Sequence, residues 1–224
     1  LQSKIVLTMT LFLLTLGTLG FYLLEHHNPA TMGTLNAAGK FQAAFFQSVT
    51  TRTAGFASIS QSGLTNGSKL LASMLMIIGG SPAGTAGGIK TTTVAVLLLT
   101  AISVLRGNKD TECYGRKITF EIIRVGITIT LVTFVFWLFG VTVMTVIEPQ
   151  QKVLDLMFEA TSAMATVGLT ADLTPVLSDI SHVVLMLMMY IGRIGPMTMA
   201  LIFSGHVDKK NQFRTLPEAK IMVG

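Results

Sequence analysis

Charged residues are scarce in this sequence of 224 residues, since Asp, Glu, Lys and Arg together make up 12% of it. Hydrophobic residues make up 50%, and the mean hydropathy is +0.65, outside the range of soluble domains. The only cysteine, Cys113, lies in a charged loop and has no partner for a disulfide or a thiolate metal site. We therefore expect a membrane protein in which Cys113 has no functional role.

Charges are absent from two long apolar runs, residues 5–24 and 125–147, each long enough to cross a hydrocarbon core of about 30 Å. Neither run alternates polar and apolar faces, as a core helix of a soluble protein would. No basic region or cleavage site precedes the first run, which argues against a signal peptide. Because the sequence begins with Leu1, we expect a piece of a longer membrane protein.

Basic residues gather at the same ends of the predicted spans: Lys4, Arg106, Lys109, Arg116, Lys117, Lys209, Lys210, Arg214 and Lys220. The loops at the opposite ends hold five acids: Glu25, Glu148, Asp155, Asp172 and Asp179. This positive-inside bias places residues 106–117 and 206–224, and both ends of the chain, in the cytoplasm of a multi-pass protein. It also accounts for the net charge of +5 without a nucleic-acid partner. The outer acids would raise the local concentration of cations.

An internal repeat organises the sequence. TTRTAGFAS around Gly55 superimposes on MATVGLTAD around Gly168 at an offset of 113 residues. Each segment follows an apolar run too short to span, residues 40–51 and 153–165, and precedes a longer run that a glycine, Gly79 or Gly192, interrupts. We therefore expect each unit to consist of a span, a half-helix, a glycine loop and a broken span.

Such re-entrant loops and broken helices require a polar interior, because unsatisfied backbone groups facing lipid cost several kcal/mol each. The alternative, that the glycines only allow close helix packing, explains isolated glycines but not a repeat with matched half-helices. The interpretation is an all-α membrane protein with two pore repeats, 1–105 and 118–206. A cytoplasmic linker, 106–117, joins the repeats, and a cytoplasmic C-terminal tail, 207–224, follows them.

The glycine loops have the composition of an ion filter. Glycine allows backbone conformations that turn carbonyl oxygens inward, and a ring of such carbonyls can replace the hydration shell of a monovalent cation. The half-helix would direct its negative C-terminal dipole toward the cation. The expected filter residues are Thr53, Ala54, Gly55, Phe56, Thr166, Val167, Gly168 and Leu169. The hydroxyls of Thr53 and Thr166 can supply further oxygen ligands for the cation, in addition to the carbonyls at Gly55 and Gly168.

Three segments, TTRTAGF, ATVGLT and GGSPAGTAGGIKTTT, resemble the Ktr/Trk/HKT superfamily of potassium transporters, and specifically its KtrB-type membrane subunit. The resemblance covers nearly all of the chain. It implies a potassium-channel-like fold of four units around a pseudo-fourfold pore, with one filter glycine in each unit. This sequence looks like the last two units, so the other half of the filter must come from chain outside it.

The resemblance also implies a function. It implies potassium uptake across the plasma membrane through a selective, gated pore, with potassium as the transported ligand, no catalytic residue and no covalent cofactor. It further implies a homodimer of membrane subunits that rests on a cytosolic nucleotide-binding regulatory ring of the KtrA type. The basic linker 106–117 and the tail 205–224 are candidate surfaces for that ring, although ordinary positive-inside charge explains them equally well.

A second glycine-rich segment breaks the apolar run at residues 79–88. It holds five glycines and one proline within GGSPAGTAGGIKTTT, which no helix tolerates. A phosphate-binding loop is excluded because Ile89 replaces the required glycine before Lys90, and the preceding run is a membrane helix. The resemblance implies a flap that closes the pore below the filter. The expected gate residues are Gly79, Gly80, Ser81, Pro82, Ala83, Gly84, Thr85, Ala86, Gly87, Gly88 and Arg193.

Four charged residues lie at membrane depth. An arginine within a span is costly and usually faces a cavity or a partner, and the resemblance implies that Arg193 contacts the gating loop as an electrostatic barrier. Lys90, at the end of that loop, could equally reach the interface by snorkelling. Arg52 and Glu159 lie near the filter, where we expect structural roles, with an ion pair as the simplest way to satisfy them.

Three other functions fit the sequence less well or stay open. A secondary transporter with alternating access would more often have inverted repeats, whereas these run parallel. A membrane-embedded enzyme would need paired acids, a metal motif or a Ser–Lys dyad within the membrane, so we expect no enzyme activity. Sodium or mixed transport stays open. In the superfamily a serine at the filter-glycine position favours sodium, and Gly55 and Gly168 are both glycine, but two loops lie outside this sequence.

Overall fold

The computed structural model of the protein describes residues 1–82, 84, 86–108 and 110–195. Its elements, in chain order, are α1 (Gln2–Glu25), α2 (Ala37–Thr50), α3 (Asn66–Ile77), α4 (Thr91–Leu105), β1 (Glu112–Cys113), β2 (Arg116–Lys117), α5 (Phe120–Ile147), α6 (Val153–Met164), a 3-10 turn (Thr174–Val176) and α7 (Asp179–Ile194). The prediction of an all-α fold is confirmed, because the only strands in the described residues are the two short ones of a hairpin.

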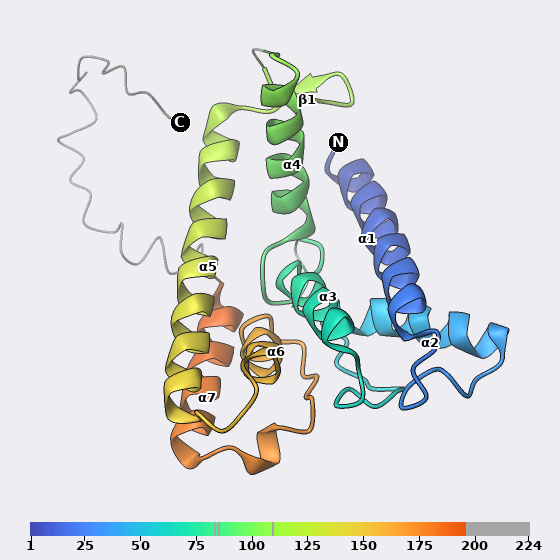
Figure 1. The fold of residues 1–224 in the computed structure, drawn as a ribbon. Helices are drawn as coiled ribbons and strands as arrows, with labels where there is room; N and C mark the ends of the chain where they lie inside the picture. Colours follow the sequence, from blue (N-terminus) through green and yellow to red (C-terminus); the bar gives the residue numbers. More distant parts are fainter. Residues whose placement is uncertain (83, 85, 109, 196–224) are drawn as a thin grey trace.

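Helices α1 and α5 are long and apolar enough to cross a membrane. Large hydrophobic side chains remain exposed along both of them, as expected of helices whose solvent is lipid: Leu7, Leu11, Leu19 and Leu23 on α1, and Leu131, Phe134, Val135 and Phe139 on α5. Figure 1 shows that the N-terminus, the hairpin and the beginning of α5 lie at one end of the molecule. The described segments that we expect to be cytoplasmic, the N-terminus and the linker 106–117, therefore lie at the same end of the molecule.

Helices α2 and α6 are the two half-helices. They contain 14 and 12 residues, so each is roughly 20 Å long and too short to cross the bilayer. Helix α2 begins at Ala37, three residues before the predicted start, because the side chain of Asn36 caps it by accepting a hydrogen bond from the Gly39 amide at 2.7 Å. Figure 1 shows α2 lying crosswise to α1.

The two units pack as one body. One hydrophobic core is built mainly from α1, α3, α4 and the hairpin, and it includes Ile123 of α5, Phe158 of α6, and Val167 and Leu169 of the second glycine loop. A second core joins α5, α6 and α7. Helix α6 contacts α3 as well as α5 and α7. The second glycine loop therefore lies at the junction of the units.

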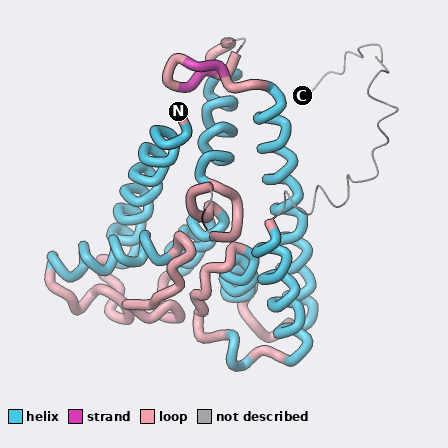
Figure 2. Tube along the Cα trace, turned by 180° about the vertical axis from the view of Figure 1, so that it is seen from behind, coloured by secondary structure: helices cyan, strands magenta, loops and turns pink. Residues whose placement is uncertain are grey.

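Helix α3 ends at Ile77 and α4 begins at Thr91, so the glycine-rich segment between them is a loop, as predicted. The two ends of this loop meet, because Ile78 pairs with Ile89 and the Ile89 amide donates to the Ile77 carbonyl at 2.9 Å. Figure 2 shows the segment as a rounded loop near the centre of the molecule. Ala83 and Thr85, two of the expected gate residues, lie outside the described residues.

The break expected at Gly192 is wrong in its position. Gly192 is helical, and α7 continues to Ile194 before Gly195 adopts a φ of 84°. A Cβ at position 192 would lie 1.9 Å from the Met164 carbonyl oxygen, so this glycine allows α7 to approach the end of α6. Residues 196–206 of the second repeat and the tail 207–224 lie outside the described residues.

The linker 106–117 contains a structure that the sequence did not predict. Strands β1 and β2 pair antiparallel as a hairpin around Tyr114 and Gly115. Cys113 lies in β1 and is buried, 7% exposed, against the core of the first unit. The expectation of a cysteine in a charged loop is therefore wrong, because one side of the hairpin packs onto α4.

Candidate ion filter and gating loop

The two glycine loops have positive φ angles at the same two positions. Thr53 and Gly55 have φ angles of 67° and 76°, and Thr166 and Gly168 have 53° and 92°. Positive φ is uncommon for residues other than glycine and costs roughly 1–3 kcal/mol where it is strained. The same strained threonine and the same left-handed glycine thus recur at the 113-residue offset. The offset is a structural relationship as well as a sequence one.

The loops also lie against each other. A Cβ on Gly55 would lie 2.2 Å from the Val167 carbonyl oxygen, so only glycine permits this approach. A Cβ on Gly168 would meet nothing nearer than the Gly55 Cα at 3.9 Å, which leaves Gly168 facing open space. Val167 and Leu169 direct their side chains into the protein, at 5% and 3% exposure. Backbone, and not side chain, therefore occupies the open face of the second loop.

In the first unit, hydroxyl and amide groups hold the glycine loop on α2. The Thr50 hydroxyl donates to the Phe56 carbonyl at 2.5 Å and closes the loop across its base. The buried amides of Gln47 and Gln61 bond each other at 2.6 and 3.0 Å, and the Gln61 amide also donates to the Ile59 carbonyl. The chain that leaves the loop is thus fixed to the half-helix that enters it.

In the second unit a carboxylate holds the chain that leaves the glycine loop on the half-helix. Glu159 on α6 is 4% exposed and accepts three hydrogen bonds, from the Thr170 hydroxyl at 2.6 Å, the Ala171 amide at 2.9 Å and the Thr174 hydroxyl at 2.8 Å. Arg52 donates instead to the Thr10 carbonyl of α1 at 3.4 Å. The ion pair expected for these two residues is wrong, since both ion pairs found among the described residues involve other side chains.

The candidate gating loop, residues 79–88, contacts the second candidate filter segment. The Gly87 amide donates to the Thr166 hydroxyl oxygen at 3.0 Å. A Cβ on Gly87 would lie 2.6 Å from that oxygen and 2.8 Å from the Ala165 carbonyl oxygen, so the contact requires glycine. Within the loop, the ammonium of Lys90 donates to the carbonyls of Ala86 and Gly84. Lys90 therefore fastens the loop's own backbone and does not extend away from it.

Lys90 and Arg193 line one cavity of about 510 Å³, between the gating loop and the end of α7. Both side chains are cationic, and no acidic residue lies among the residues that line the cavity. Arg193 stands in the last turn of α7, which Gly192 holds against the end of α6. The arrangement places two positive charges beside the loop of residues 79–88.

Two contacts between the units were missed from the sequence. The ammonium of Lys69 on α3 binds the carboxylate of Asp155, in the first turn of α6, at 2.6 Å, and both side chains are largely buried. Beyond the glycine loops, the Ser62 hydroxyl donates to the carboxylate of Asp172 at 2.6 Å. The sequence placed Asp155 in an outer loop and gave no signal that it faces Lys69.

Comparison with known proteins identifies the family. The sequence profile of the TrkH family, described as a cation transport protein, matches residues 2–214. The chain belongs to the TrkH family. It is 37% identical over its whole length to the Ktr system potassium uptake protein B of Bacillus subtilis, covering 49% of that protein. It is 34% identical to the potassium/sodium uptake protein NtpJ of Enterococcus hirae, again over its whole length and 50% of that protein.

The fold agrees with this assignment. The crystal structure of the potassium transporter TrkH from Vibrio parahaemolyticus superimposes with a TM-score of 0.72 at 17% identity, over 92% of this chain and 44% of that one. The chain thus spans about half the length of the TrkH-family relatives that it matches. The superfamily resemblance and the channel-like membrane fold predicted from the sequence are confirmed.

Proposed function

We propose that this chain supplies two of the four loops of a potassium-selective pore, through which potassium enters the cell across the plasma membrane. The observation that carries the proposal is the shared conformation of two adjoining loops, each with a left-handed threonine and a left-handed glycine at the end of a half-helix. The names of the Ktr-system relatives support potassium as the ion. The remaining two loops would come from chain outside this sequence.

In the proposed filter, backbone carbonyls of residues 53–56 and 166–169 replace the water around a potassium ion. Gly55 and Gly168 carry no side chain that would intrude, and the C-terminal ends of α2 and α6 add a negative potential. The hydroxyl of Thr53 adds an oxygen ligand. The hydroxyl of Thr166 accepts a hydrogen bond from Gly87, so the docked loop competes with the ion for this oxygen.

The gate in this proposal is the loop of residues 79–88 together with Arg193. While Gly87 stays bound to Thr166, the loop lies against the filter segment, and Lys90 and Arg193 add positive charge beside it. Opening requires the loop to leave Thr166. Small residues within the loop, Gly79, Gly80 and Gly88 among them, leave few side-chain atoms to obstruct such a movement.

Sodium, alone or with potassium, is the second candidate ion. The Enterococcus hirae relative is named a potassium/sodium uptake protein and is 34% identical to this chain. Glycine at both visible filter positions favours potassium, and two filter loops lie outside this sequence. Selectivity of the complete protein decides between the candidates.

We also propose that the complete membrane subunit forms a homodimer and binds a cytosolic nucleotide-binding ring of the KtrA type. The hairpin is the candidate docking surface within the described residues, and Arg116 and Lys117 are exposed on it. Co-purification of the ring with the complete subunit, and its loss when both residues become glutamate, would support this contact. Retention of the ring by that variant would place the contact elsewhere.

The function is tested by expressing the complete protein in cells that lack their own potassium uptake. Growth at limiting potassium, with rubidium uptake that sodium does not suppress, supports a potassium pore. Uptake of sodium in preference to rubidium would establish the second candidate. Absence of both fluxes at normal expression would contradict the proposal.

A further inference from the structure

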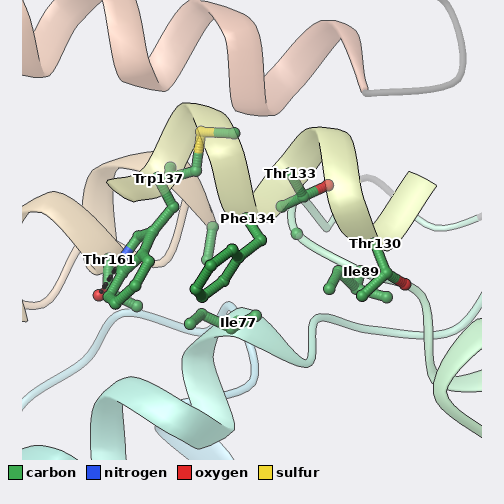
Figure 3. A pocket seen from close by; sticks show the side chains of 10 residues that line it. Ile77, Ile89, Thr130, Thr133, Phe134, Trp137 and Thr161 are labelled. Atoms are coloured by element: carbon green, nitrogen blue, oxygen red, sulfur yellow. Dashed lines mark hydrogen bonds between the residues drawn. The ribbon is translucent and has the colours of Figure 1, made fainter. Parts of the chain in front are cut away.

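A partly enclosed apolar cavity lies beside the candidate gating loop and the turn that precedes Thr166. It has a volume of about 180 Å³ and is enclosed by the middle of α5, the end of α3, the return of the gating loop and the last turn of α6. Figure 3 shows Phe134 and Trp137 of α5 on one side, with Ile77 and Ile89 opposite them. Both pore units therefore contribute to its wall.

The polar atoms of this wall are already used. Hydroxyls of Thr130 and Thr133 donate to carbonyls one turn earlier on α5, at 2.9 and 2.8 Å. The Thr161 hydroxyl donates to the Met157 carbonyl and accepts from the indole N–H of Trp137 at 2.8 Å. The hydrogens of these hydroxyls are donated within the protein and the exposed lining is almost wholly apolar, and apolar cavities of roughly this size stay dry and bind hydrocarbons.

The position of the cavity indicates which hydrocarbon enters it. Residues 130–137 are the middle of the 28-residue helix α5, so they lie near the centre of the bilayer, where only lipid chains are present. Phe134 lines the cavity and is also 53% exposed, so the cavity reaches the lipid-facing surface of α5. We propose that the end of a phospholipid acyl chain occupies this cavity.

The chain in this site would touch the gate. Ile89 and Gly88 belong to the gating loop, and the Ile89 amide is bonded to the Ile77 carbonyl in the docked arrangement. On the other side, Met164 and Ala165 form the turn that precedes Thr166, to which Gly87 is bonded. An acyl chain packed between these walls stabilises the docked loop. This regulatory effect rests on the proposed gate, whereas binding of the acyl chain does not.

Trp137 is the only tryptophan of this sequence, so it can report on the occupant. The complete protein is placed in phosphatidylcholine vesicles whose acyl chains carry bromine, a contact quencher, and the Trp137 signal is obtained by subtracting a Trp137→Phe variant. In Thr133→Leu the larger side chain narrows the cavity, and in Thr133→Val the volume of the side chain is nearly unchanged. Thr128→Leu makes the same change on the exposed surface of α5, outside the cavity.

We expect quenching of Trp137 to fall about twofold or more in Thr133→Leu and to be unchanged in Thr133→Val and Thr128→Leu. Thr130→Leu, at a second position in the wall, should reproduce the fall. Equal quenching in all variants would overturn the site, because bromine would then reach Trp137 from lipid outside the cavity. Rubidium uptake tests the effect on the gate separately. Uptake should be higher in Thr133→Leu, where less of the chain that stabilises the docked loop can enter, than in Thr133→Val, and equal uptake would overturn the regulatory effect alone.

Discussion

The amide of Gly87 in the gating loop donates a hydrogen bond to the hydroxyl of Thr166 in the second filter segment, at 3.0 Å. These residues are 79 positions apart in the sequence, and the bond joins the loop between α3 and α4 to the segment that follows α6. In the proposed pore, an oxygen that can bind an ion is thereby occupied by the gate. In this proposal, closure of the gate and ion binding in the filter are linked at the Thr166 side chain.

Gly87→Ala should raise ion flux. The new methyl group would lie 2.6 Å from the Thr166 hydroxyl and 2.8 Å from the Ala165 carbonyl, so the loop must move away. Gly84→Ala is the matched control in the same loop, because its nearest neighbour would be the Ser81 carbonyl at 3.3 Å. Rubidium uptake by the complete protein measures the effect. Reduced uptake in Gly87→Ala at normal expression would show that the loop supports the pore and does not close it.

Lys69→Met should destabilise the protein by about 3 kcal/mol, because it leaves the largely buried carboxylate of Asp155 without its partner. Lys117→Met breaks the exposed pair with Asp110 in the hairpin and should cost less than about 1 kcal/mol. Thermal unfolding of the purified complete protein compares the two. Equal losses would mean that the Lys69 pair does not hold α3 to α6.

The acid stability of the protein should depend on Glu148, just beyond the end of α5. Hydrogen bonds from Ser178, and then from Ser181, lower the pKa of Glu148 below its ordinary value of 4.5. A carboxylate whose pKa is lower in the folded state stabilises the fold when the pH is above its unfolded-state pKa. This contribution is lost as the pH falls through the folded-state pKa.

Glu148→Gln should therefore have a lower melting temperature than the parent protein near neutral pH. The difference between the two melting temperatures should shrink as the pH falls from about 6 to about 3. Glu112→Gln, in the exposed part of the hairpin, is the control. Parallel pH curves for the parent and Glu148→Gln proteins would show that this carboxylate does not couple folding to pH.

Cysteine labelling tests the orientation in the membrane. Cys113 is buried and the side chain of Asn36 caps α2, so neither position suits labelling. We choose Thr34 and Asn108, which are both exposed, and replace them by cysteine in a Cys113→Ser background. An impermeant maleimide applied to intact cells should label a cysteine at position 34 and not one at position 108. The reverse pattern would invert the proposed topology.

The helices could be predicted from the sequence because apolar runs and glycines mark their ends directly. The prediction failed where one residue serves tertiary packing. Glycine costs only about 1 kcal/mol within a helix, so Gly192 can remain helical, and its contact with the Met164 carbonyl explains why it is there. Neither the hydrophobic periodicity nor the composition of the sequence predicts that contact.

The polar contacts of the site were the least predictable part. Lys69 and Asp155 are 86 residues apart, and Glu159 finds its partners beyond the glycine loop, at Thr170 and Thr174. Hydropathy marks such residues as out of place in a membrane but does not identify their partners. The hairpin was missed for a related reason, since strands of two residues leave no alternating pattern to detect.

The central claim is that the two glycine loops form part of the filter, and Gly168→Ser tests it most directly. A Cβ at Gly168 meets nothing within 3.9 Å, whereas Gly55→Ser would collide with the Val167 carbonyl and displace the second loop. Gly107→Ser is the control, because Gly107 also has a positive φ, 71°, and open space around it, but lies in the linker.

The measurement is the ratio of rubidium to sodium uptake by the complete protein. We expect Gly168→Ser to lower this ratio at normal expression, and Gly107→Ser to leave it unchanged. An unchanged ratio in Gly168→Ser would remove this loop from the filter and contradict the account.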